Sequence, residues 1–422
     1  MGQDMYTTAD RPSKGVLVTT AVLGALLLLL AALVPGCPVE RDSASDGPIT
    51  TGVTDNQIFL GSSLALEGHA GYLGSQLYHG AMAYIREINA QGGVHGRRIV
   101  VRAYDDSYEP PQCLANTQRL IIEDQVFALF SYVGTPTTVK VVPMIEDAEI
   151  PLVGMFTGAN GLREPYNPLL INIRPSYYQE TAAIVRHLVE GLEKERIAVF
   201  YQFDAYGFDG LAGTELALRQ YDLTPVARGS YIRGTLNVSD ALRRIRTSRA
   251  DAVVMIGTSK PCAKLIQMAR HSGYTPTFYA LSFVGAEDLA QHLARYSVDD
   301  ASVFMSQVVP PPTAPASEAI LPLAREYIQL LNRYYPEERP NVVGLEGYLN
   351  ARVLVEGLRR AGRDLTRGRF LQAFQQMRDF DLGGRTRIRF GPRDNQGLDE
   401  VYLTRLQDGA FRLLEGIQEL KD

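Results

Sequence analysis

Short apolar runs alternate with amphipathic segments along most of this chain, from about residue 57 onward. The run 58–66 predicts a strand, and residues 76–89 predict a helix because their apolar side chains share one face at a period of 3.6 residues. Gly92 and Gly93 end that helix. Strands alternating with helices are typical of a parallel sheet covered by helices on both faces, so the sequence predicts an α/β fold.

The predicted strands are too many for one small sheet, which indicates two doubly wound lobes. A proline-rich break at residues 310–315 lets the chain return from the second lobe to the first. Helical patterns at 317–334, 343–361 and 365–377 then complete the first lobe. A hairpin at Gly383-Gly384 and a last strand follow. The predicted strands after the first are 99–104, 126–132, 152–153, 170–173, 197–201, 226–231, 252–256, 277–281, 303–308 and 401–406.

The first segment of the chain differs from the rest in its charge pattern. Arg11 and Lys14 precede an uncharged apolar run at 15–33. This pattern is typical of an export signal or a membrane anchor. An uncleaved membrane helix stays open as an alternative, because the run is just long enough to span a bilayer. Under both readings the chain from residue 50 onward lies outside the cytoplasm.

The apolar run ends in the tetrapeptide VPGC at 34–37, which resembles the lipobox of bacterial lipoproteins. This resemblance implies lipidation of Cys37 and a leader at 1–37. Residues 38–50 are rich in Ser, Asp and Gly and are expected to form a flexible linker. We therefore expect a periplasmic or outer-face location, with the protein held at the membrane by its N-terminus.

Composition and charge exclude several other classes of protein. The 422 residues are 45% hydrophobic, enough for two compact domains, and the net charge of -5 includes no basic block that would attract nucleic acid. Three cysteines form no CxxC pair, and six histidines are scattered, so no metal or other cofactor is predicted. Nucleophile-elbow, P-loop and dinucleotide motifs are absent from the sequence, which argues against an enzyme.

Two stretches carry a resemblance to a known family. Residues 80–97 contain INAQGGVHGR, followed by Tyr-Asp-Asp at 104–106, and residues 196–207 pair a strand with Tyr-Gly. These motifs resemble those of the type I periplasmic binding proteins, represented by the leucine/isoleucine/valine-binding protein of ABC transporters, over nearly all of 51–407. The resemblance implies ligand capture between two lobes joined by three crossovers. The crossovers are expected near Arg174, Val308 and Asp399, with an N-terminal lobe at 51–174 and 308–398 and a C-terminal lobe at 175–307 and 399–422.

The segment 133–138 (VGTPTT) lies between a predicted strand and a predicted helix. Helix N-termini favour anions, and hydroxyl groups add donors. The segment aligns with the carboxylate-binding serine loop of the family, so Gly134, Thr135 and Thr137 are candidate ligand residues. An ordinary helix cap is the alternative for Thr135.

The segment 155–160 (MFTGAN) matches the place where the family contacts the ligand's amino and carboxylate groups. We expect Thr157 and Gly158 to contact the ligand, with Phe156 as an apolar wall. A plain turn is the alternative, because Gly and Asn favour turns. The first loop, ending at Leu73, is expected to approach the same cleft.

The second lobe is expected to contribute Tyr206, Thr258 and the loop 281–285, which includes Ser282 and Phe283. The ring and hydroxyl of Tyr206 suit a residue that closes over a ligand. The alternative for Tyr206 is packing at the start of a surface helix.

One position departs from the family pattern. Ser282 aligns with the glutamate that holds the ligand's ammonium group in branched-chain amino-acid binders, and a hydroxyl cannot neutralise a buried ammonium. Leucine itself is therefore in doubt as the ligand. Glu67, Asp204 and Glu287 are candidates to replace the missing carboxylate.

The family's disulfide is also missing. The two positions that would carry it align with Tyr108 and Tyr132, whereas Cys113 and Cys262 fall in different lobes. We expect both cysteines to be unpaired thiols.

Together these features predict a monomeric binding protein that delivers a small polar ligand, amino-acid-like, to an ABC permease in the inner membrane. The lobes are expected to close around the ligand. A ligand-sensing receptor of the same fold is the alternative, because the sequence of the binding protein does not separate transport from sensing.

Overall fold

The computed structural model describes residues 50–298, 302–312, 321–383 and 386–414. The predicted leader 1–37 with Cys37, the linker up to residue 49, and residues 415–422 lie outside the described residues. Pro48–Asp422 forms one compact unit. Within the described ranges, no helix combines the length and apolar character needed to cross a membrane.

The first sheet has five parallel strands in the order β2-β1-β3-β4-β5. Ser131, at φ 55°, ends β3 earlier than the pattern at 126–132 predicts. The strands of this first sheet and the three helices between them are β1 (Gln57–Leu64), α1 (Gly71–Ala90), β2 (Arg98–Asp105), α2 (Pro110–Ile122), β3 (Ala128–Phe130), α3 (Thr135–Asp147), β4 (Leu152–Val153) and β5 (Leu170–Ile171).

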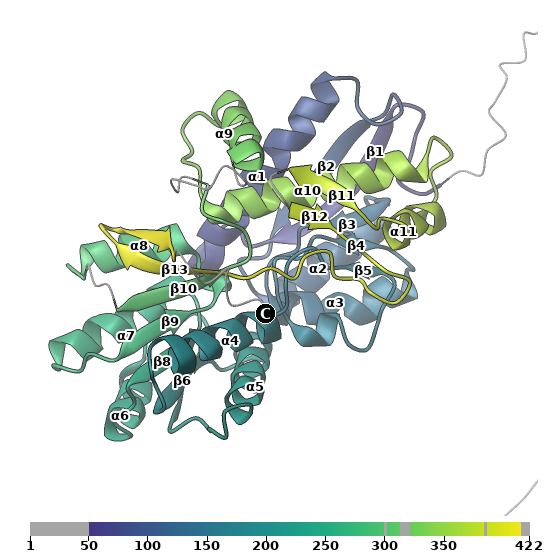
Figure 1. The fold of residues 1–422 in the computed structure, drawn as a ribbon. Helices are drawn as coiled ribbons and strands as arrows, with labels where there is room; N and C mark the ends of the chain where they lie inside the picture. Colours follow the sequence, from purple (N-terminus) through teal and green to yellow (C-terminus); the bar gives the residue numbers. More distant parts are fainter. Residues whose placement is uncertain (1–49, 299–301, 313–320, 384–385, 415–422) are drawn as a thin grey trace, which may run out of the picture. The chain divides into compact units, whose positions relative to one another are not determined.

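Helix α1 packs closely against α10 (Val342–Ala361), although the two lie far apart in the sequence (Figure 1). A Cβ on Gly80 would lie 1.8 Å from the carbonyl oxygen of Gly344, and one on Gly347 would lie 2.0 Å from that of Leu77. Glycine is therefore required at both contact points. This close packing holds the N-terminal half of α10, with Glu346, against the first lobe.

The second sheet has seven strands in the order β14-β13-β10-β9-β8-β6-β7. Five are parallel, as predicted, but β13 runs antiparallel to both β10 and β14. The elements are α4 (Tyr177–Arg186), β6 (Ile197–Gln202), α5 (Ala205–Arg219), β7 (Arg228–Tyr231), α6 (Ser239–Thr247), β8 (Ala252–Ile256), α7 (Ser259–His271), β9 (Thr277–Ala280), α8 (Ala286–Arg295), β10 (Val303–Gln307), β13 (Tyr402–Gln407) and β14 (Ala410–Leu413).

The antiparallel edge corrects the expectation of purely parallel sheets, and β14 was not predicted. Asp408 and Gly409 join β13 to β14 with φ values of 51° and 71°. Two positive φ values in a two-residue loop are those of a type I′ hairpin turn, which favours Asp-Gly. The predicted α/β fold with two parallel-sheet lobes is otherwise confirmed.

The chain passes between the two sheets three times: after β5, after β10 and before β13. The first and third passages run side by side, because Asn172 N donates to Asn395 O (2.7 Å) and Gly397 N donates to Asn172 O (2.9 Å). The second passage leads to α9 (Leu321–Tyr334), α10, α11 (Arg367–Gln375) and the hairpin of β11 (Phe380–Gly383) with β12 (Thr386–Ile388).

Both described cysteines, Cys113 and Cys262, are buried and free, which confirms the prediction of unpaired thiols. Burial raises the pKa of each thiol well above its usual range. A neutral buried thiol is a weak nucleophile. These two cysteines therefore belong to the packing of the two lobes.

Candidate ligand-binding site

Two loops of the first lobe meet at the start of α3. Gly134 N donates to Phe156 O (3.1 Å), and the hydroxyls of Thr135 and Thr157 lie 2.7 Å apart. Gly134 has φ 96°, and a Cβ there would lie 2.0 Å from the ring of Tyr108. Glycine at this position therefore allows both the left-handed turn and the close approach of Tyr108. The structure thus brings Gly134, Thr135, Phe156 and Thr157 together.

Thr137 and Gly158 lie in the same two loops but have other contacts. The hydroxyl of Thr137 donates to the carbonyl oxygens of Val133 and Gly134, within its own turn. Gly158 O accepts a hydrogen bond from Tyr177 N (2.6 Å), and a Cβ on Gly158 would lie 2.6 Å from the Tyr177 ring. Gly158 therefore lets the start of α4 reach the first lobe.

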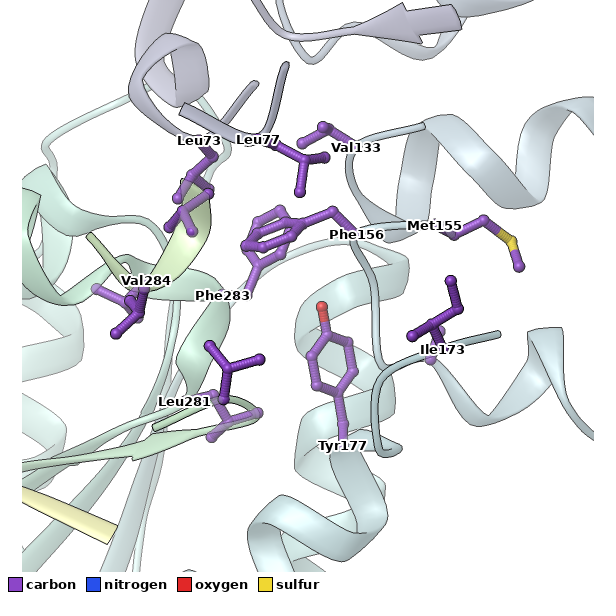
Figure 2. Packing of buried hydrophobic residues seen from close by; sticks show 14 of the residues in the cluster. Leu73, Leu77, Val133, Met155, Phe156, Ile173, Tyr177, Leu281, Phe283 and Val284 are labelled. Carbon is purple, nitrogen blue, oxygen red and sulfur yellow. The ribbon is translucent and has the colours of Figure 1, made fainter. Parts of the chain in front are cut away.

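Five aromatic side chains fill the contact between the lobes, and we call them the aromatic cluster: Tyr108, Phe156, Tyr177, Tyr206 and Phe283. Each is at most 1% exposed. The ring centroid of Phe283 lies 4.7 Å from that of Tyr206, 5.5 Å from Phe156 and 5.7 Å from Tyr108. Figure 2 shows the hydroxyl of Tyr177 pointing toward the rings of Phe156 and Phe283. Phe283 therefore joins aromatic side chains of both lobes.

One hydroxyl group of the aromatic cluster has unused hydrogen-bonding capacity. Tyr206 is fully buried, and its hydroxyl has no hydrogen-bond partner in the part of the chain that the structure describes. Leaving a buried polar group unpaired costs about 1–3 kcal/mol. A buried hydroxyl without a partner is suited to contact a ligand that enters between the lobes.

Leu73 and Thr258 lie at the margins of this region. Leu73 is buried at the start of α1, and a Cβ on Gly285 would lie 2.9 Å from its Cδ2. Leu73 therefore packs against the loop that carries Phe283. Thr258 N donates to the hydroxyl of Tyr231 (3.0 Å). The hydroxyl of Tyr231 in turn donates to Gln202 Oε1, and Gln202 Nε2 donates to the hydroxyl of Tyr108.

A buried charged cluster lies beside the aromatic cluster, and of its four residues only Ser282 was among the ligand residues expected from the sequence. Arg174 Nη2 donates to Glu180 Oε1 (3.1 Å) and to Ser282 Oγ, and Arg174 Nη1 lies 3.4 Å from Glu346 Oε1. The guanidinium carbon lies 4.9 Å from the ring centroid of Phe156. We call Arg174, Glu180, Ser282 and Glu346 the charged cluster.

Burial and ion pairing shift the pKa values of Arg174 and Glu346 in opposite directions. Burial disfavours the Arg174 cation, but the carboxylates of Glu346 and Glu180 outweigh burial and raise the pKa of Arg174. Burial raises the pKa of Glu346 to about 7, although Arg174 opposes that shift. Burial and the neighbouring Arg174 lower the pKa of Arg163 to about 9.

The three acids suggested as replacements for the missing glutamate have different surroundings. Glu67 is exposed. Asp204 caps α5 by accepting from the backbone N–H groups of Tyr206 and Gly207. Glu287 Oε1 accepts from Val342 N (3.1 Å), at the start of α10.

A different signal in the sequence points to Glu346. It is the single acid in the apolar stretch 342–355 of α10, and Arg174 is likewise the only charged residue between 169 and 179. Isolated charges in apolar runs are buried with partners or at sites of function. The sequence alone does not show that Arg174 and Glu346 meet. Their contact forms because the first passage between the sheets packs against α10.

Two α/β lobes with loops, aromatic rings and unpaired polar groups between them define a two-lobed binding protein. The family model described as "Periplasmic binding protein" matches residues 57–410. The chain therefore belongs to the periplasmic binding protein family, as the motifs predicted. Members of this family bind small-molecule ligands and are in general not enzymes.

Individual relatives agree with this assignment. A solved structure of a possible leucine/isoleucine/valine-binding protein from Rhodopirellula baltica is 34% identical, with a TM-score of 0.79, covering 85% of this chain and 96% of that one. Leu/Ile/Val-binding protein homolog 7 of Brucella abortus is 24% identical over 72% of this chain and 77% of its own length. An amino acid binding protein of Pseudomonas aeruginosa is 26% identical over 51% of this chain; the match spans only 58% of that protein. Such relatives imply an extracytoplasmic location.

Proposed function

We propose that this protein is the substrate-binding protein of an ABC importer and captures a small, amino-acid-like ligand between its lobes. The proposed ligand residues are those of the two first-lobe loops, with Tyr206, Phe283 and Leu73 closing over them. The observation that carries the proposal is the enclosure of the Thr135–Thr157 hydroxyl pair and the unpaired hydroxyl of Tyr206 between the two lobes.

The ligand's carboxylate is expected at the start of α3. Helix N-termini favour anions, and the Thr135 and Thr157 hydroxyls lie at this end of the helix. The hydroxyl of Thr137 already donates within its turn, so we expect Thr137 to contribute through its backbone N–H. The apolar part of the ligand then lies against Phe156 and Phe283.

Closure of the lobes is expected to accompany binding. Contacts between the lobes include Asn160 N with Asp209 Oδ1 (3.1 Å) and Val342 N with Glu287 Oε1 (3.1 Å). A ligand that touches both lobes favours the closed form because only that form makes both sets of contacts. A permease in the membrane then recognises the closed form as the ligand-bound protein. We propose lobe boundaries at residues 174, 308 and 399, a monomer, and a lipid anchor on Cys37 after removal of the leader.

Thermal-shift screening and calorimetry of the purified protein against amino acids, amides and carboxylic acids test this function. A ligand at about 100 times its Kd stabilises by about 2.7 kcal/mol. We expect Thr157→Val to weaken binding of the hit by about 1–3 kcal/mol, because a charged ligand group loses a hydrogen bond. Small-angle scattering with saturating ligand should report a more compact protein.

Thr138→Val is the matched control, because the Thr138 hydroxyl donates to Gly134 O in the same buried turn. It should affect stability while leaving affinity nearly unchanged. Equal losses in both variants, or identical scattering curves with and without a bound ligand, would contradict the proposed site or the proposed closure.

A further inference from the structure

Two carboxylates of the second lobe bond to the starts of two helices of the first lobe. Asp209, on α5, accepts from Asn160 N with both of its oxygens (3.1 and 3.2 Å), and Asn160 begins the short 3-10 helix Asn160–Leu162. Glu287, in the first turn of α8, accepts from the N–H of Val342 (3.1 Å), the first residue of α10. Backbone N–H groups at helix starts need acceptors from outside the helix. Here the opposite lobe supplies these acceptors, so both contacts exist only while the lobes are together.

The carboxyl of Glu287 is enclosed mainly by groups of the first lobe. Burial raises its pKa to about 7, although hydrogen bonds with Val342 N and with the hydroxyl of Tyr72 on α1 oppose the shift. No Lys or Arg pairs with Glu287 within the described ranges. The other titratable groups around it are Asp288 of α8, which pairs with His292, Tyr327 of α9 and Glu338 of the loop before α10.

Asp209 has a similar environment at the other contact. Burial raises its pKa to about 6, although hydrogen bonds from the backbone of Asn160 and Gly161 and the charge of Arg163 oppose the shift. The second lobe adds Tyr178, on α4, as the titratable neighbour of Asp209. At both contacts burial therefore outweighs the first-lobe donors, and the closed form favours the protonated acid.

Separation of the lobes returns both carboxyls to water, because the groups that cover them belong largely to the first lobe. Their pKa values then fall back toward the ordinary 4.5 of Glu287 and 3.8 of Asp209. A group whose pKa is higher in the closed form takes up a proton on closure. Its contribution to closure is complete below the ordinary pKa. That contribution is lost as the pH rises from 4.5 to about 7 for Glu287, and from 3.8 to about 6 for Asp209.

We propose that Asp209 and Glu287 are positioning residues that couple closure of the lobes, and with it ligand affinity, to the uptake of protons. This inference rests on the proposed function and adds a regulation to it. Neither acid belongs to the proposed ligand residues, so both act by changing the population of the closed form. Through these two acids, the protein holds its ligand more tightly in mildly acidic surroundings and releases it more readily near neutral pH.

The test measures affinity as a function of pH in wild type and in Glu287→Gln and Asp209→Asn, which keep an acceptor for the first-lobe N–H groups. Calorimetry uses the common L-amino acids without ionisable side chains as probes, because their charge is constant from pH 5 to 7. We expect the affinity of Glu287→Gln relative to wild type to rise by up to about tenfold per pH unit between pH 5 and 7. Asp209→Asn should show the same change between pH 5 and 6. Titrations in buffers of different ionisation enthalpy should detect fewer protons taken up by each variant than by wild type.

Glu109→Gln is the matched control. Glu109 also bonds across the lobes, to Arg233, but it is half-exposed, so water solvates it in the open and the closed form. The pH profile of this variant should therefore parallel that of wild type. Burial lowers the pKa of His69, which lies near Gly234 of the second lobe, and this acts against the two acids. The comparison of variants with wild type removes that contribution, because His69 is present in all of them.

Profiles of Glu287→Gln and Asp209→Asn that parallel wild type overturn the coupling but leave ligand capture intact. If no probe binds, the amino-acid-like ligand of the proposed function is overturned instead, and small-angle scattering of the ligand-free protein decides on the coupling. A radius of gyration that grows between pH 5 and 7 more in wild type than in the double variant supports it. The same dependence on pH in both proteins overturns it.

Discussion

Two sets of charged side chains connect the lobes, and they differ mainly in exposure. The side chain of Arg174 is 1% exposed, with Glu180 and Glu346 as partners at 3.1 and 3.4 Å. The side chain of Arg233 is 21% exposed, and its partner Glu109, at 3.0 Å, is 50% exposed. The distances are similar, but water screens only the second pair. Burial therefore decides which charges control stability.

The largest expected effect is that of Arg174→Met. Removing the guanidinium leaves Glu180 and Glu346 buried without their cation, which is expected to destabilise the protein by about 3–5 kcal/mol. Urea unfolding at pH 8 measures the change. The loss should shrink at pH 6, where Glu346, with a pKa of about 7, is mostly protonated. A loss of unfolding free energy below about 1 kcal/mol at pH 8 would mean that burial does not make the ion pairs of Arg174 important for stability.

A smaller effect is expected from the pH dependence of a single buried acid. Burial raises the pKa of Glu287 from 4.5 to about 7, so the folded protein holds this proton more tightly than the unfolded chain. The contribution of Glu287 to stability is therefore greatest at low pH and is lost, by up to about 1.4 kcal/mol per unit, as the pH rises from 4.5 to 7.

Glu287→Gln removes this contribution while keeping an acceptor for Val342 N. We expect the difference in unfolding free energy between wild type and variant to change across the range from pH 5 to 7, in favour of the variant at higher pH. Urea unfolding at several pH values measures it. Parallel stability curves for the two proteins would mean that Glu287 titrates in the ordinary range.

The smallest effect is expected for the partly exposed ion pair of Arg233 and Glu109. Arg233 Nη1 donates to Tyr108 O (2.8 Å), and Nη2 donates to Glu109 (3.0 Å). Because Glu109 is half-exposed, Glu109→Gln should cost about 0.2–1 kcal/mol, and high salt should reduce that cost further. Urea unfolding at low and high ionic strength measures both. A cost that is large and independent of salt would mean that water does not screen the Arg233–Glu109 pair and that exposure does not distinguish it from the buried pairs of Arg174.

Much of the fold could be predicted because its signals are local. Gly92-Gly93 follows α1 closely, and β8 at Ala252–Ile256 matches the predicted apolar run. The antiparallel edge could not be predicted, because an apolar run such as 401–406 does not encode strand direction. That direction follows from the passage by which the chain re-enters the second lobe.

The candidate site divides in the same way. Gly134, Thr135 and Thr157 were found from local motifs and lie together, because they end neighbouring parallel strands. Tyr177 and the three charged residues of the charged cluster were not found. Their partners come from segments 6 to more than 170 residues apart, such as Arg174 with Glu180 and with Glu346.

By itself, the sequence determined the alternation of strands and helices, the family, and the loops that begin at strand ends, because these follow from local periodicity and short motifs. Only the tertiary structure decided which isolated charges meet and which polar atoms remain unpaired between the lobes. The physical reason is that burial and pairing depend on which distant segments pack together, and no local pattern records that choice.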